Sequence, residues 1–198
     1  KLSTKQMKDS ILIIDFGSQV TKLIARRIRD FGVYSQIVAY NKLNKDFFKK
    51  NVIKGIIFSG GPSSVEKKNS PKIKKFIYEL KIPILGICYG LQLLCKHFGG
   101  SVTSSEDREF GKKNIFLLKN SLLTKGTYLL KKKYQVWMSH SDKVDRIPNG
   151  FEKVASSDDC EFAIVQDIKK IFFGVQFHPE VIHTLNGIKL IKNFVFSI

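Results

Sequence analysis

The chain has 198 residues, of which 43% are hydrophobic and 12% aromatic, and this composition excludes a disordered segment. A net charge of +17 suggests nucleic acid, but 29 of the 34 basic residues are scattered Lys, so we expect a solvated surface and no nucleic-acid partner. The apolar runs are too short for a membrane span. Three cysteines without paired spacing favour a reducing, cytoplasmic location and no metal site.

Short apolar runs alternate with helical patterns in the first half of the chain. Strands are expected at residues 11–15, 33–40, 55–61 and 83–87. Helices are expected at residues 19–31, 43–50, 70–80 and 89–98. Alternation of strands and helices predicts a parallel sheet covered by helices.

The second half of the chain changes character. Short strands joined by turns are expected at residues 101–105, 114–119, 134–138, 151–157, 161–166 and 171–177, before a final amphipathic helix at 185–197. We therefore predict an α/β fold, an open and mostly parallel sheet with helices on both faces plus a short antiparallel extension. Residues 1–10 are expected to be a loose arm or an expression remnant, and residues 11–198 one domain.

Cys88 lies between two glycines where a predicted strand meets a predicted helix. Gly86-Ile87-Cys88-Tyr89-Gly90 fits the nucleophile-elbow pattern G-x-S-x-G with Cys in place of Ser. The glycines allow a sharp turn that lifts the thiol to a helix N-terminus, where free N–H groups favour a thiolate. The N–H of Tyr89 is then free to face an oxyanion. The competing interpretation is a small buried side chain in a turn, as expected for Cys95 and Cys160.

A base and an orienting carboxylate are available at the end of another predicted strand. In GVQFHPEV, His178 and Glu180 lie two residues apart, so in extended chain they face the same way. Such a carboxylate can hold the imidazole in the correct tautomer, as in a Ser-His-Asp triad. His97 is expected at the surface of the helix after the elbow. The carboxyl ends of strands in an open sheet are where sites form.

The loop Ser59-Gly60-Gly61-Pro62 follows a third predicted strand at the same edge. It is expected to bring a second N–H, that of Gly61, to an oxyanion hole. SGGPSS is similar to a phosphate loop, but the Asp of that loop is absent and no G-x-x-x-x-G-K-[ST] pattern occurs. We therefore expect no nucleotide at this loop.

The elbow GICYGLQLL, the loop SGGP and the segment HPE resemble the class I (triad) glutamine amidotransferases. The segments DFGSQ, REFG, WMSHSDKV and HPEVIHT narrow the resemblance to the amidotransferase domains of GMP synthetases. It covers residues 11–198. The family's fold is a doubly wound α/β domain, and its activity is the hydrolysis of glutamine to glutamate and ammonia.

The resemblance implies roles for single residues. Cys88 would be the nucleophile, His178 the acid and base, and Glu180 the residue that orients His178. Gly61 and Tyr89 would form the oxyanion hole. Residues that would hold the glutamine are Gln92, Ser139, His140 and Asp142, with Asp142 at the α-amino group. Arg108 and Glu109 would serve structure or an interface, and His183 and Thr184 would face a partner.

That partner would be an ATP pyrophosphatase or synthetase unit, as a domain or a separate subunit, which aminates xanthosine monophosphate (XMP) to GMP. ATP and Mg²⁺ are expected only in that unit, with no cofactor in this domain. Three alternatives stay open: the glutaminase part of anthranilate or carbamoyl phosphate synthase, a cysteine hydrolase, and a non-catalytic binding module. REFG and WMSHSDKV disfavour the first of these, and the presence of Gln92 and Asp142 disfavours the second.

Overall fold

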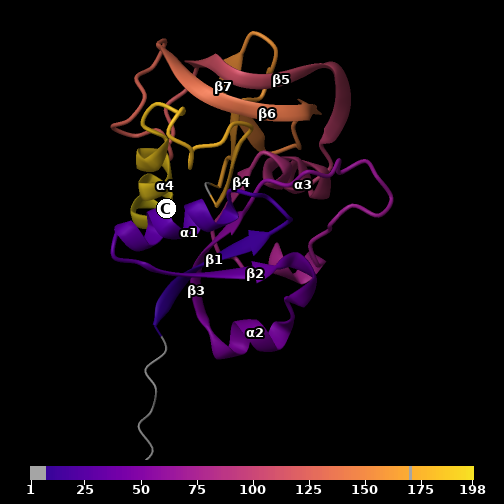
Figure 1. Ribbon diagram of the computed structural model, residues 1–198, viewed down its shortest axis with the longest axis vertical. Helices are drawn as coiled ribbons and strands as arrows, with labels where there is room; N and C mark the ends of the chain where they lie inside the picture. Colours follow the sequence, from indigo (N-terminus) through magenta and orange to yellow (C-terminus); the bar gives the residue numbers. More distant parts are fainter. Residues whose placement is uncertain (1–7, 170) are drawn as a thin grey trace, which may run out of the picture.

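The chain is built around one mixed sheet of nine strands (Figure 1). The structure is a computed structural model that describes residues 8–169 and 171–198, and for residues 105–107 it describes the backbone alone. The strand order is β2-β1-β3-β4-β9-β8-β7-β5-β6. The predicted arm at residues 1–10 lies mostly outside the described residues, and the first strand begins at Asp9. None of the helices in the described ranges is long and apolar enough to cross a membrane.

The parallel half of the sheet agrees with the predicted alternation of strands and helices. Its strands are β1 (Asp9–Asp15), β2 (Tyr34–Ala39), β3 (Val52–Phe58), β4 (Ile84–Ile87) and β9 (Phe172–Val175). β4 pairs with β9 in parallel, so the end of the elbow strand and the strand before His178 are neighbours. The sheet topology thus brings together two segments that are far apart in sequence.

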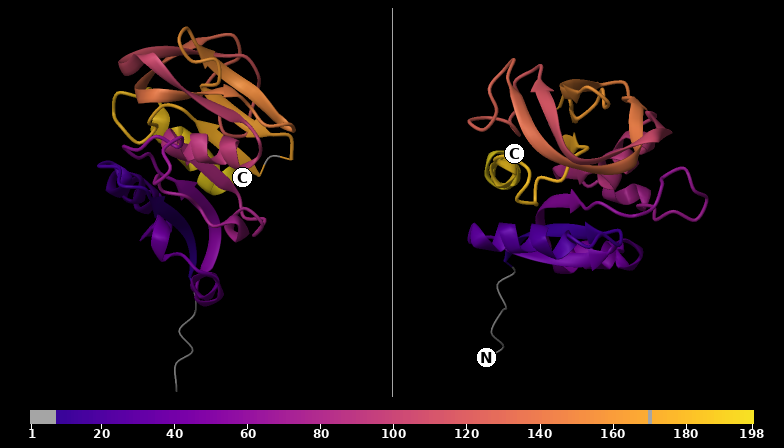
Figure 2. Two further views of the ribbon diagram at one scale, coloured as in Figure 1. Left: turned by 90° about the vertical axis from the view of Figure 1, so that its right-hand side faces the viewer. Right: turned by 45° about the horizontal axis from the view of Figure 1, so that its top comes forward.

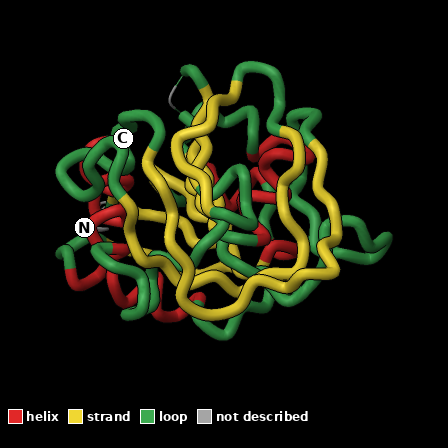
Figure 3. Tube along the Cα trace, turned by 90° about the horizontal axis from the view of Figure 1, so that it is seen from above, coloured by secondary structure: helices red, strands yellow, loops and turns green. Residues whose placement is uncertain are grey.

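The antiparallel half is longer than expected. It consists of β8 (Ile164–Asp167), β7 (Phe151–Ser157), β5 (Ser101–Leu117) and β6 (Lys133–Arg146). The two short strands expected at residues 101–105 and 114–119 are one 17-residue strand, which pairs with the 14-residue β6. Figure 2 shows these strands curving away from the parallel half, and Figure 3 shows long bent strands in the view from above. The predicted fold class is confirmed.

Helices cover both faces of the sheet. α1 (Thr21–Asp30) and α4 (Gly187–Ser197) pack on one face, where their apolar side chains join those of alternate strand residues such as Ile13 and Phe173. On the other face α3 (Tyr89–His97) and α2 (Lys45–Lys50) pack over Leu12 and Phe58. Figure 1 shows α1 and α4 together and α2 apart from them. Strands buried on both faces explain the uninterrupted apolar runs of the parallel half.

The prediction of a helix at residues 70–80 is wrong. Only a 3₁₀ turn, η2 (Lys75–Ile77), forms there, after an extended Lys74. A second 3₁₀ turn, η1 (Tyr40–Lys42), follows β2. Ile77 and Tyr78 are buried against the α3 face, so the segment follows the packing of these side chains rather than a helical pattern. An isolated helix of about ten residues is marginal in water, and tertiary packing readily overrides it.

Candidate active site

Cys88 occupies the sharp turn between β4 and α3. Its backbone has φ +52°, an uncommon conformation for a residue with a side chain and one that often marks functional turns. A Cβ on Gly86 would lie 2.7 Å from the backbone of Gly90, and a Cβ on Gly90 would lie 2.4 Å from the carbonyl oxygen of Phe58. Both glycines are therefore required for the close approach of helix and strand. The turn leaves the Cys88 thiol at the N-terminus of α3.

His178 and Glu180 form a buried pair beside this cysteine. Nδ1 of His178 donates to Oε1 of Glu180 over 2.8 Å, and Glu180 is fully buried. This bond leaves Nε2 of His178 unused by Glu180, and Cys88 acts electrostatically on the ring. The structure thus brings the predicted nucleophile, base and orienting carboxylate close together, because Cys88 and His178 both lie next to Gly60.

The environment of His178 favours its charged form. Burial alone would lower the pKa of His178, but hydrogen bonds to Cys88 and Glu180, and the negative charge of these groups, raise it well above its ordinary value. An imidazolium next to a thiolate is the reactive pair of a cysteine nucleophile. By contrast, burial raises the pKa of the Cys95 and Cys160 thiols to about 12, so both remain neutral.

The loop after β3 closes over the pair. A Cβ on Gly60 would lie 2.9 Å from Cε1 of His178, and one on Gly61 would lie 3.0 Å from the carbonyl oxygen of Phe16. Gly61, Tyr89 and Cys88 line the same cavity of about 830 Å³. As the first helical residue of α3, Tyr89 has an N–H without an intrahelical partner. Gly61 and Tyr89 thus line the cavity that Cys88 also lines, and their role as an oxyanion hole stays a prediction.

The predicted glutamine-binding residues line this cavity from another side. Ser139, His140 and Asp142 come from β6, and Gln92 comes from the first turns of α3. Asp142 is 6% exposed and its Oδ2 has no hydrogen-bond partner among the described residues. Because Asp142 lines the cavity, its carboxylate can attract a cationic group such as an ammonium.

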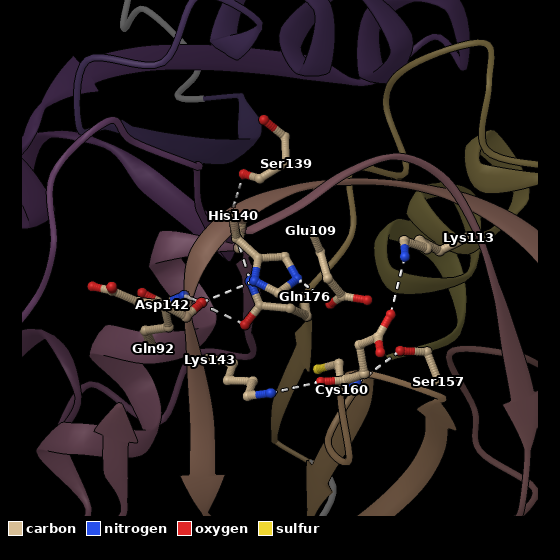
Figure 4. A network of polar contacts seen from close by, with 12 residues as sticks. Gln92, Glu109, Lys113, Ser139, His140, Asp142, Lys143, Ser157, Cys160 and Gln176 are labelled. Carbon is tan, nitrogen blue, oxygen red and sulfur yellow. Dashed lines mark hydrogen bonds and ion pairs between the residues drawn. The ribbon is translucent and has the colours of Figure 1, made fainter. Parts of the chain in front are cut away.

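His140 has a structural partner rather than a free ring. Its Nε2 lies 2.8 Å from Oε2 of the buried Glu109, and its Nδ1 faces the carbonyl oxygen of Asp142 at 3.0 Å. With Cys160, these two side chains bring three potential metal-ligand atoms within 4.8 Å of one another. Two of these three atoms, Nε2 of His140 and Oε2 of Glu109, already contact each other. Figure 4 shows His140 between Asp142 and Glu109.

Two buried residues near the site had no assigned catalytic role in the sequence analysis. Nε2 of Gln176 donates to the sulfur of Cys88 over 3.5 Å. Thr184 donates to the carbonyl oxygen of His178 over 2.6 Å and accepts from the N–H of Trp137 over 3.0 Å. Thr184 is 4% exposed, so the expectation that it faces a partner is wrong. His183 next to it is exposed, as expected.

The remaining expectations concern surface residues. His97 is exposed and stacks on Tyr78, which confirms its predicted place. Arg108 is exposed at the cavity wall, while its neighbour Glu109 is buried, in agreement with a structural role for Glu109. The sequence could have indicated a place for Gln176 in the site. Gln176, His178 and Glu180 are spaced two residues apart, so in an extended chain their side chains share one face.

The fold and this arrangement of residues agree with one protein family. The family described as Glutamine amidotransferase class-I matches residues 12–198. This chain belongs to the class-I glutamine amidotransferases. The family resemblance that the motifs indicate is thereby confirmed.

Relatives of this amidotransferase chain carry a common name. A GMP synthase (glutamine-hydrolyzing) of Zymomonas mobilis is 48% identical over 198 residues, covering 100% of this chain and 38% of the relative. One of Agrobacterium fabrum is 50% identical over 190 residues, covering 96% and 36%. The chain therefore spans less than half the length of these curated relatives. Among solved structures, a Thermoplasma acidophilum protein described as a GMP synthase subunit is 30% identical to this chain and has a TM-score of 0.80. The match covers 95% of this chain and 92% of the Thermoplasma acidophilum protein.

Proposed function

We propose that this chain hydrolyses glutamine to glutamate and ammonia through a thioester on Cys88, and supplies the ammonia to a synthetase unit that converts XMP to GMP. One observation carries the first part: the buried pair of His178 and Glu180 lies beside Cys88 at the edge of a cavity. The names of the relatives support the second part. They favour GMP synthesis over the alternatives of anthranilate or carbamoyl phosphate synthesis.

The proposed reaction begins with the Cys88–His178 pair. The thiolate of Cys88 attacks the side-chain amide carbon of glutamine, and the carbonyl oxygen becomes an oxyanion next to the N–H groups of Gly61 and Tyr89. When the C–N bond breaks, the imidazolium of His178 gives its proton to the departing nitrogen, which leaves as ammonia. The resulting neutral imidazole takes a proton from water, which attacks the thioester. Glutamate leaves and the Cys88 sulfur is restored.

The rest of the site is suited to holding an amino acid. The carboxylate of Asp142, which lines the cavity, supplies a negative charge for the α-amino group of glutamine. Ser139 and His140 contribute through main-chain atoms of β6. Gln92 donates over 2.8 Å to the carbonyl oxygen of Asp142, which holds that residue against the helix. Binding at both ends of the substrate orients its amide carbon toward Cys88.

The partner is proposed to be an ATP pyrophosphatase or synthetase unit, either fused to this chain or separate from it. ATP and Mg²⁺ belong to the chemistry of that unit, and this domain is proposed to work without a cofactor. A cytoplasmic location follows from the soluble nucleotide substrates of such an enzyme. The similarity to longer synthases and to a protein described as a single synthase subunit supports either arrangement.

The test measures glutamate release from glutamine by this chain and by its Cys88→Ala variant. Each is assayed alone and with the synthetase part of the Zymomonas mobilis relative loaded with ATP, Mg²⁺ and XMP. We expect turnover that requires Cys88 and rises with the loaded partner. Turnover that requires Cys88 but ignores the partner would favour another amidotransferase. Absence of turnover under every condition would reject the glutaminase.

A further inference from the structure

The side-chain amide of Gln176 lies next to the nucleophile, at the end of β9. Its Nε2 is 3.5 Å from the sulfur of Cys88, and the residue is fully buried. The carbonyl oxygen of Ser139 faces the same sulfur at 3.7 Å. A carbonyl oxygen only accepts hydrogen bonds and so favours the protonated thiol, whereas an amide N–H only donates and so favours the thiolate. The two contacts therefore act on Cys88 in opposite directions.

The orientation of the Gln176 amide follows from a chain of buried contacts. The carbonyl oxygen of Asp142 accepts from Nε2 of Gln92 over 2.8 Å, and it cannot donate. The amide nitrogen of Gln92 must therefore face Asp142, and its second hydrogen faces Oε1 of Gln176 at 3.4 Å. With its oxygen directed at Gln92, Gln176 presents its NH₂ group to Cys88. Figure 4 shows Gln92 close to Asp142, with Gln176 beside them.

The far end of this chain is held by the buried contact between His140 and Glu109. Nδ1 of His140 lies 3.0 Å from the carbonyl oxygen of Asp142, which has a second lone pair besides the one that Gln92 uses. On the opposite side of the ring, Nε2 of His140 contacts Oε2 of Glu109. Asp142, Gln92, Gln176 and Cys88 are each no more than 6% exposed, so water competes little for these contacts.

We propose that Gln176 is a further catalytic residue, which donates a hydrogen bond to the Cys88 thiolate, and that Gln92 and the Asp142 carbonyl group fix its amide in the donating orientation. The proposal rests on the proposed role of Cys88 as nucleophile. The proposal gives Gln92 a second role besides contact with glutamine. The same chain of hydrogen bonds then connects the substrate-binding residue Gln92 with the activation of Cys88.

The test is the pH dependence of Cys88 alkylation by iodoacetamide in the absence of glutamine, followed by mass spectrometry of the Cys88 peptide. The thiolate sulfur displaces iodide, so the rate follows the thiolate fraction. Among the described residues, His178, backed by Glu180, and the neutral thiol of Cys160 interact with Cys88, and Arg108, His140 and Asp142 line the same cavity. These groups are unchanged in the variants, and a shift is therefore assignable to the amide.

In Gln176→Met, which keeps the length but has no donor, we expect the pH midpoint to rise by about one unit. That is about a tenfold lower rate on the acid side, with the plateau at high pH retained. Gln92→Met should shift the midpoint in the same direction by less, and the double variant should shift it by less than the sum. The matched control is Gln166→Met, because Gln166 is equally buried but donates to Glu152 instead of Cys88. It should leave the midpoint unchanged.

An unchanged midpoint in Gln176→Met would overturn the proposal. If that variant does not fold, an unchanged midpoint in Gln92→Met would do the same. A shift of equal size in Gln166→Met would also contradict it, since the effect would then come from loss of any buried amide. The readout needs no glutamine, so a chain without glutaminase activity but with the expected shifts would reject only the proposed function.

Discussion

Glu180 is the residue whose replacement tests the electrostatics of the site most sharply. Its Oε1 lies 2.8 Å from Nδ1 of His178 and the side chain is fully buried. Glu180→Gln keeps the shape and an acceptor oxygen but removes the charge. A hydrogen bond to a charged group contributes about 1.5 kcal/mol more than one between neutral groups, which corresponds to about one unit in the pKa of His178. Burial, which lowers this pKa, is then opposed mainly by Cys88.

We expect the pKa of His178 to fall by about one unit in Glu180→Gln, measured by NMR titration of the imidazole signals. Glutamate release at neutral pH should fall about a hundredfold, because His178 loses both its charged form and its fixed tautomer. Glu161→Gln is the control, since Glu161 is 63% exposed and pairs with Lys153 at the surface. An unchanged or higher pKa of His178 in Glu180→Gln would refute this account of the pair.

Three further predictions concern the cavity and its pH dependence. Asp142→Asn removes the charge proposed for the α-amino group, so the KM for glutamine should rise at least tenfold with a smaller change in kcat, and equal losses in both would contradict this role. Gly60→Ala places a Cβ 2.9 Å from Cε1 of His178, so kcat should fall more than tenfold while the Tm drops by only a few degrees. The pKa of His178 in the folded chain is raised above the unfolded value of about 6.5. Protonated His178 therefore contributes fully to the free energy of unfolding below about pH 6.5, and this contribution is lost as the pH rises through the folded pKa. Urea unfolding at pH 7 and pH 9.5 should therefore show a larger loss of stability in the wild type than in His178→Gln.

The parts of the fold that sequence predicts well are those where a local pattern and the final packing agree. The apolar run Ile11–Asp15 is buried on both faces, and Gly86 and Gly90 stand where the backbone of helix and strand meet. The helix expected at 70–80 fails because Ile77 and Tyr78 are placed by long-range contacts with the α3 face. The length of β5 was also missed, since its pairing with β6 continues through polar residues with no apolar alternation.

In the site, too, local patterns predict some contacts and long-range pairing decides the others. His178 and Glu180 were identifiable from two-residue spacing, because an extended backbone fixes which side chains share a face. The Glu109–His140 pair was not, since it depends on the register of two long antiparallel strands, in which Glu109 is opposite His140. The contact of Gln176 with Cys88 likewise depends on the pairing of β4 with β9, which no local pattern encodes.

The most direct measurement of the central claim is the intact mass of the chain after incubation with a diazoketone analogue of glutamine, which alkylates a thiolate with loss of nitrogen gas. We predict one adduct, located on Cys88 by peptide mapping, formed more slowly when glutamine competes and absent in Cys88→Ala. No adduct, or an adduct on Cys95 or Cys160 that glutamine does not suppress, would contradict the assignment of Cys88 as the nucleophile of a glutamine-binding site.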